Sequence, residues 1–338
     1  MWNPFTAPRF TPTPGCCSPP YRRSAQSPPK ARRSAARRTE PRPEGALSPR
    51  AARGRAYQVN RLSDSLYSIR EDISDGRFPI LIYLVAGTRK AVLIDTGLGT
   101  GNLRKTAESI TGLPIAVLHT HAHGDHVGAD SQFGEIYLNE RDFGPSGEGY
   151  DARALARQRG QFIRARLAGA DGPERHGPAA NHLAEIRETR CRKIGDGDIA
   201  DLGGIRLRAV ATPGHTPGSL SYVDEAHGCA FTGDGIADIH WFDGTVAVED
   251  FLNTLRHFEA NAKGVERIYA AHLPEPFGMD LVRDLQSAAE AILGGARDAV
   301  ENADYQFLRH GKLYVHRSGA ATIYYRRENV YHRPRRRG

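Results

Sequence analysis

Thr120-His121-Ala122-His123-Gly124-Asp125-His126 is the stretch of the chain that decides its fold. It directly follows the short apolar run at 115–118, which predicts a buried strand. His121 and His123 stand two positions apart, so a locally extended backbone would send both side chains to the same side. We expect the chain to turn at Gly124 into a helix, which would aim Asp125 and His126 at a second point nearby. One bend can therefore serve two metal ions.

Three later stretches each place a possible metal ligand after a strand-like run. They are Thr212-Pro213-Gly214-His215-Thr216-Pro217-Gly218-Ser219, Phe231-Thr232-Gly233-Asp234-Gly235 and Ala270-Ala271-His272. A single histidine or aspartate at a strand end is more often structural than functional. Because His215, Asp234 and His272 follow the seven-residue motif in order, they form one candidate set with it.

Together these motifs resemble the His-x-His-x-Asp-His signature of the metallo-β-lactamase fold, most closely its glyoxalase II-like and lactonase-like branch. The resemblance covers roughly residues 60 to 295 and departs in detail at Ala270-Ala271-His272, where the family often has Pro-Gly-His. It implies a four-layer αββα sandwich, in which two β-sheets pack face to face with helices outside. It also implies two ligand groups, with Asp234 bridging: His121, His123 and His215 on one metal, and Asp125, His126 and His272 on the other.

The resemblance gives two aspartates further roles. Asp95, in Asp95-Thr96-Gly97-Leu98-Gly99, would lie under the metal loop and orient it through hydrogen bonds. Asp125 would be the catalytic proton shuttle to the leaving group. Imidazole and carboxylate ligands suit two divalent transition-metal ions, zinc first, with iron and manganese as alternatives. Two such ions can share a hydroxide, because a catalytic zinc lowers the pKa of bound water from 15.7 to about 7.

The function implied is a binuclear metal-dependent hydrolase that cleaves an ester, thioester or lactone bond of a small-molecule substrate. Three alternatives stay open. A phosphodiesterase or ribonuclease of the same fold would give the basic ends of the chain a purpose. A single-iron sulfur dioxygenase would use a reduced ligand set. A non-catalytic binding module would need a degenerate site, whereas all seven ligand positions are filled. The substrate-binding residues stay unassigned.

Charge is distributed unevenly along the 338 residues, which carry a net charge of +7. Residues 1–55 have twelve Lys or Arg and two acids, and residues 326–338 have six Arg and one acid. The part between them is therefore acidic, with 28 basic and 36 acidic residues. This distribution argues against nucleic-acid binding except through the basic tails.

Composition predicts three parts of the chain. Residues 1–55, rich in Pro, Arg and Ser, are expected to be a disordered tail. For this tail, an extension without function, an organelle transit peptide and a basic arm for an acidic partner or nucleic acid stay open. Residues 56–325 are expected to form the hydrolase domain, and 326–338 a second basic tail. No apolar run reaches the ~18 residues of a membrane helix, so we expect no membrane partner and a cytoplasmic protein.

Residues 144–190 interrupt the alternation of strands and helices and are expected to lie over the active site. A helix is predicted over Arg153–Leu167. Its arginines are expected to form a solvated face, with the alternative that one or two reach the cleft and favour an anionic substrate. His176 and His182 are expected to be packed or solvated. Other predicted helices are Asn102–Ile110, Glu249–Asn261 and Met279–Leu293, and a terminal hairpin is predicted within 297–325. Cys229 is expected to be a buried apolar residue.

Overall fold

The computed structural model describes residues 57–71, 78–167, 183–187, 189–242, 245–296, 298, 300–301 and 312–331. The predictions for residues 1–55, His176 and His182 lie outside this part of the chain. Within it, no helix is long and apolar enough to cross a membrane.

The first sheet has seven strands that neighbour one another in chain order. They are β1 (Tyr57–Arg61), β2 (Leu66–Glu71), β3 (Ile80–Ala86), β4 (Ala91–Ile94), β5 (Ile115–Leu118), β6 (Ile136–Leu138) and β7 (Arg192–Lys193). Strands β1 to β4 pair antiparallel, and β4 to β7 pair parallel. Helix α1 (Leu103–Glu108) packs Leu103 and Ala107 against this sheet, and Asn102 caps the helix by accepting the amide of Lys105 at 2.8 Å.

The second sheet has the strand order β13-β11-β10-β9-β8. These strands are β8 (Ile199–Asp201), β9 (Arg206–Ala211), β10 (Leu220–Asp224), β11 (Cys229–Gly233) and β13 (Arg267–Ala270). Apolar side chains of both sheets form one buried cluster, in which the Tyr83 and Phe231 rings lie 5.3 Å apart. The two sheets therefore pack face to face, and Cys229 is buried between them, as predicted.

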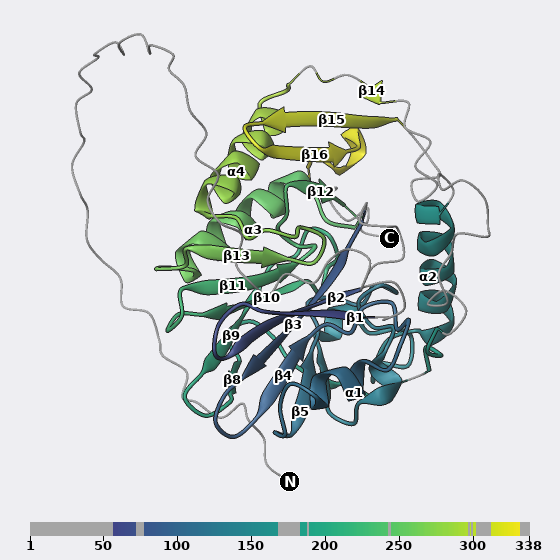
Figure 1. Cartoon of the computed structure of the whole chain (residues 1–338). Coiled ribbons are helices and arrows are strands. Elements are labelled where there is room, and N and C mark those ends of the chain that lie inside the picture. The colour runs from purple at the N-terminus through teal and green to yellow at the C-terminus, as the bar shows by residue number, and fades with distance from the viewer. Residues whose placement is uncertain are drawn as a thin grey trace, which may run out of the picture.

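Helices α3 (Val248–Asn261) and α4 (Met279–Leu293) cover the outer face of the second sheet. Phe251, Leu255 and Phe258 of α3 are buried there, as their helical spacing predicts. A third sheet packs on α4 in the order β12 (Ile239–Trp241), β16 (Ala321–Tyr325), β15 (Leu313–Ser318), β14 (Val300–Glu301). Figure 1 shows the resulting layers: α3 and α4, then the two large sheets, then α1 at the bottom. This is the predicted αββα sandwich.

One prediction about the metal loop is wrong. Residues 124–126 form a turn instead of a helix, and only the short 3-10 helix Asp130–Gln132 follows. The backbone amide of Gly128 donates to the carbonyl of Gly97 at 2.7 Å, which ties the segment to the loop after β4. A Cβ atom at Gly128 would come 2.2 Å from the backbone of Leu98, so only glycine permits this approach. A long-range contact therefore overrides the local helical tendency.

Candidate metal centre

The candidate ligands follow the carboxyl ends of strands from both large sheets. The seven-residue motif follows β5, His215 follows β9, Asp234 follows β11 and His272 follows β13. Backbone hydrogen bonds join these segments: the amide of Leu220 donates to Thr120 at 2.8 Å, and that of Ala271 to Gly233 at 3.1 Å. The sheets therefore bring distant parts of the sequence to one place.

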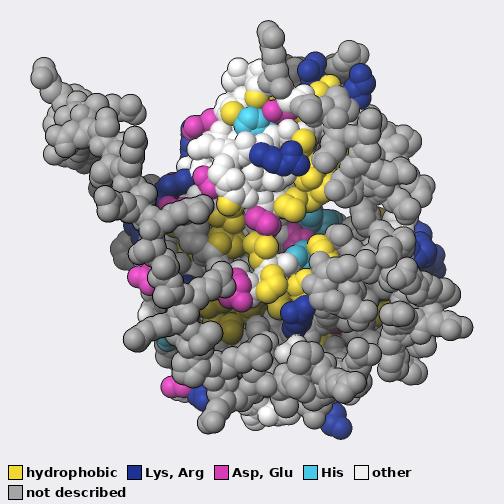
Figure 2. Space-filling model, turned by 45° about the horizontal axis from the view of Figure 1, so that its top comes forward, with side chains coloured by type: hydrophobic (Ala, Val, Ile, Leu, Met, Phe, Trp, Pro, Cys, Tyr) yellow, Lys and Arg dark blue, Asp and Glu magenta, His cyan; other side chains and the backbone are white. Residues whose placement is uncertain are grey.

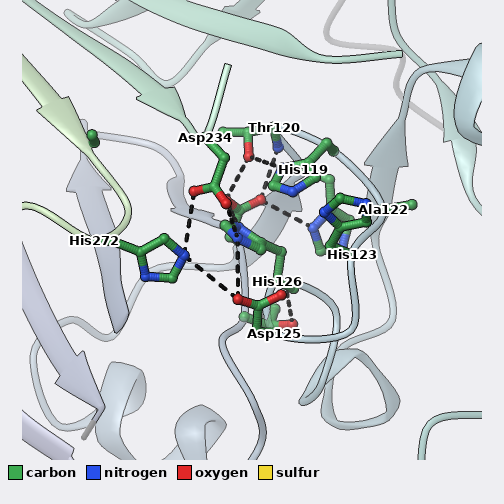
Figure 3. Close-up of polar contacts among 12 residues, drawn as sticks. His119, Thr120, Ala122, His123, Asp125, His126, Asp234 and His272 are labelled. Carbon is green, nitrogen blue, oxygen red and sulfur yellow. Dashed lines mark hydrogen bonds and ion pairs between the residues drawn. The ribbon is translucent and has the colours of Figure 1, made fainter. Parts of the chain in front are cut away.

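The structure brings all seven predicted ligand residues together. Their ligand atoms form three groups, each with its atoms within 4.8 Å of one another: His121, His123 and His215; His121, His126 and Asp234; and Asp125, His126 and His272. Figure 3 shows His272 pointing toward Asp234 and Asp125, with its Nε2 atom 3.4 Å from Asp234 Oδ1 and 3.5 Å from Asp125 Oδ2. Since two groups share His121 or His126 with the group that contains Asp234, the three groups form one continuous cluster.

Several atoms of this cluster are buried without the usual hydrogen bonds. Among the described residues, His121 Nε2, His126 Nε2 and Asp234 Oδ1 have no hydrogen-bond partner. A buried polar atom without a hydrogen-bond partner lowers the stability of the folded protein by roughly 1–3 kcal/mol. Divalent cations would satisfy all three atoms, and the imidazole and carboxylate donors suit such ions. The residues present therefore fit a metal site.

Hydrogen bonds fix which imidazole nitrogen faces the cluster. The Thr120 hydroxyl donates to Asp95 at 2.7 Å, so it accepts from Nδ1 of His121 at 3.0 Å. His126 donates from Nδ1 to Asp95 at 2.8 Å. Each bond places the proton on Nδ1 and leaves the lone pair of Nε2 for a cation.

Backbone carbonyls orient two further histidines in the same way. His215 donates from Nδ1 to the carbonyl of Trp241 at 3.0 Å, and His272 donates from Nδ1 to that of Pro79 at 3.0 Å. The Nε2 atom of His215 then lies 2.9 Å from Nδ1 of His123, inside the first ligand group.

The electrostatics of the cluster favour positive charge at its carboxylates. Burial, and after it the neighbouring His215, lowers the pKa of His123 to about 3, so His123 is neutral. Burial also acts to lower the pKa of His272, but Asp234 and Asp125 outweigh it and raise that pKa to about 9. The carboxylates therefore attract positive charge, which protonated imidazoles or a divalent cation can supply.

Asp95 lies beneath the metal loop, where the sequence predicts it. Beyond the bonds described above, its Oδ1 atom accepts the backbone amide of Thr120 at 2.8 Å. Burial opposes its ionisation, yet His126 and His119 lower its pKa to about 2. Asp95 has a φ of 64°, and it is the one non-glycine residue with a positive φ in the described part of the chain. This strained backbone conformation directs the carboxylate of Asp95 toward the metal loop.

Sequence reasoning missed Asp142. Its carboxylate accepts from the amide of Ala122 at 3.1 Å, the hydroxyl of Thr216 at 2.8 Å and the amide of Gly218 at 2.7 Å. It therefore joins the loop that carries His121 and His123 to the loop that carries His215. The sequence around Asp142 resembles an ordinary helix start and forms the 3-10 helix Glu140–Asp142, so it carries no signal of this role.

Helix α2 (Ala152–Leu167), in the predicted insertion, packs directly on the metal loop. Gln158 accepts the amide of Gly124 at 2.8 Å, and a Cβ atom at Gly124 would come 2.6 Å from the carbonyl of Leu155. Arg159 is buried and donates to the carbonyls of Leu98 at 2.9 Å and Ala184 at 2.8 Å. Arg159 thus joins helix α2 to the loop after β4, whereas Arg153, Arg157 and Arg164 are exposed.

Comparisons with known proteins agree with this geometry. The family model described as "Metallo-beta-lactamase superfamily" matches residues 75–275. The human acyl-coenzyme A thioesterase MBLAC2 is 27% identical over 254 residues, which cover 68% of this chain and 86% of that protein. The probable metallo-hydrolase YqgX of Bacillus subtilis is 29% identical over 176 residues, or 50% of this chain and 70% of that protein.

A fungal relative and a solved structure extend the comparison. The atrochrysone carboxyl ACP thioesterase of Aspergillus fumigatus is 24% identical over 284 residues, covering 81% of this chain and 56% of that protein. A metallo-β-lactamase family protein from Thermus thermophilus shares the fold, with a TM-score of 0.50 and 24% identity over 69% of this chain and 82% of that one. The chain therefore belongs to the metallo-β-lactamase superfamily, and it is a hydrolase of that superfamily.

Proposed function

We propose that this protein is a thioesterase that uses two divalent metal ions to hydrolyse the acyl thioester of a small-molecule substrate. One observation carries the proposal: two separate three-residue ligand groups adjoin a third group that contains Asp234. Support for the substrate class comes from the thioesterases of human and Aspergillus fumigatus, which are similar over most of this chain.

The proposed ligand assignment follows the three groups. His121, His123 and His215 would hold one ion, and Asp125, His126 and His272 would hold the other. Asp234 would be shared by both ions. Zinc is the proposed ion, because neutral imidazoles and carboxylates are ligands that it accepts. When bound, the ions supply a hydroxide nucleophile at neutral pH and polarise the acyl carbonyl.

Asp125 is the proposed proton carrier. Its Oδ2 atom makes the contacts with His272 at 3.5 Å and with His126 at 3.8 Å, so Oδ1 is the atom that can hand a proton to the leaving group. A thiol leaving group has a pKa near 8.5, whereas an alcohol resembles water, with a pKa of about 15.7. A thioester therefore depends less on this proton than an oxygen ester does.

A substrate panel tests the proposal. Thioester, lactone, phosphodiester and β-lactam substrates are offered to full-length protein reconstituted with zinc, and kcat/KM is compared. The highest value is expected for a thioester, while the highest value for a phosphodiester would replace this proposal with the nuclease alternative. Asp125→Asn should lower turnover within the range of about 10²–10⁴-fold, with the smaller loss on thioesters. Equal losses on esters and thioesters would contradict the proton-carrier role.

A further inference from the structure

We propose that Phe78 and Phe162 form the wall against which the acyl group of the substrate lies, so that helix α2 sets acyl-chain selectivity. This inference rests on the proposed thioesterase function. The two rings come from opposite ends of the first half of the domain, one just before β3 and the other in α2.

The wall begins at a candidate metal ligand. The Phe78 ring lies 4.2 Å from the His272 ring at an interplanar angle of 32°. The Phe162 ring lies 5.4 Å from Phe78 and 6.3 Å from His272. All three side chains are half-buried, so each keeps an accessible part. Figure 2 shows hydrophobic side chains beside histidine and acidic side chains in a hollow of the molecular surface.

The position of His272 determines which part of the substrate meets the rings. Its Nε2 atom faces Asp125 and Asp234, so the reacting carbonyl must lie on that edge of the imidazole. The flat face of the same imidazole is turned to Phe78. A group attached to the carbonyl on this side therefore runs along Phe78 and then Phe162.

Hydrogen bonds tie the segments that carry Phe78 and Phe162 to the segments that carry the candidate ligands. The carbonyl of Pro79, next to Phe78, accepts the Nδ1 proton of His272 at 3.0 Å. Gln158, one helical turn before Phe162, accepts the amide of Gly124 within the metal loop at 2.8 Å. Residues next to Phe78 and one turn before Phe162 are thus hydrogen-bonded to the segments that carry candidate ligands, which is the arrangement a selectivity element needs.

The acyl group is the part of a thioester that fits two aromatic rings. The thiol part of coenzyme A or of a carrier protein is polar and phosphorylated, whereas an acyl chain is apolar and gains by leaving water. Each methylene that the rings cover should raise kcat/KM by about fourfold. Selectivity should therefore rise with acyl-chain length until the chain passes Phe162.

Acyl-chain profiles test the inference. Zinc-loaded full-length protein is assayed with butanoyl-, octanoyl- and dodecanoyl-coenzyme A. The same acyl groups are also offered on N-acetylcysteamine, which lacks the nucleotide. Phe162→Ala should flatten the rise of kcat/KM with chain length on both thiols. Phe162→Leu, which keeps apolar bulk, should restore part of the slope. Phe133→Ala, a half-buried phenylalanine packed in the cluster under the first sheet, is the matched control and should keep the wild-type slope.

Each outcome has one meaning. A loss that is equal for all chain lengths would place the rings against the thiol arm and overturn the acyl assignment. An unchanged slope in active Phe162→Ala and Phe78→Ala proteins would overturn it as well. Absence of thioester hydrolysis by the wild type would remove the proposed function and the inference together. Calorimetric binding of dodecanoate, the product, supplies a readout without turnover: Phe162→Ala should weaken it at least tenfold and leave acetate binding unchanged.

Discussion

The Oδ1 atom of Asp142 accepts the backbone amide of Gly218 at 2.7 Å, across 76 residues of chain. The other oxygen of this carboxylate accepts from Ala122 and Thr216, so all three partners are donors. A carboxylate accepts from all of them at once, whereas an amide would turn a donor toward at least one. Asp142 therefore fixes the distance between the loop of His123 and the loop of His215.

Replacing Asp142 tests this role. We expect Asp142→Asn to weaken binding of the metal ion assigned to His121, His123 and His215 by about 10- to 100-fold. The reason is that the hydrogen bonds joining the loops of these ligands are lost. Competition with a chromogenic chelator measures the affinity. The matched control is Asp198→Asn, since Asp198 also accepts a backbone amide, that of Gly195 at 2.8 Å, in a turn before β8. Equal metal affinities in the two variants would show that Asp142 has no special part in the site.

Asp95 supports a second prediction, which separates its charge from its backbone conformation. Asp95→Asn keeps a residue that tolerates a positive φ, but its amide would donate to Nδ1 of His126. The proton of that imidazole would then move to Nε2, which could no longer bind a cation. We expect the affinity for the metal ion assigned to Asp125, His126 and His272 to fall by about 10- to 100-fold, with little change in melting temperature. An Asp95→Asn protein with wild-type metal content would refute the assigned tautomer.

The buried cysteines give a third prediction. Burial raises the pKa values of Cys191 and Cys229 to about 12, so both thiols stay protonated at neutral pH. Because the thiolate is the reactive form, iodoacetamide should label these two residues only after unfolding. Cys229→Ala should also keep the wild-type metal content, since no thiolate belongs to the ligand groups. Rapid labelling of the folded protein at Cys229 would contradict its burial.

Local patterns were enough to predict the longer helices, and the family resemblance carried by short motifs singled out the candidate ligand loops. Met279–Leu293 has the predicted bounds, and α3 begins one residue before the predicted Glu249. Each of these helices buries an apolar stripe with regular spacing, which a sequence displays directly. Candidate ligands such as Asp234 could be found because short motifs at strand ends carry them.

Long-range contacts account for what the sequence did not predict. The turn at Gly124 depends on the loop after β4, and the bond from His272 to Pro79 spans 193 residues. Strands β7 and β14 have only two residues each and show no periodicity of their own. Phe78 and Asp142 gain their roles only when distant strand ends meet, so no local pattern marks them.

The rate of acyl-coenzyme A hydrolysis after chelation and again after zinc is restored tests the central claim most directly. We predict that removal of the metal abolishes hydrolysis, and that activity returns in proportion to zinc up to about two ions per chain. His121→Ala, treated in the same way, should recover little activity. Hydrolysis that persists in protein stripped of metal, or none in protein that holds two ions, would contradict a metal-dependent thioesterase.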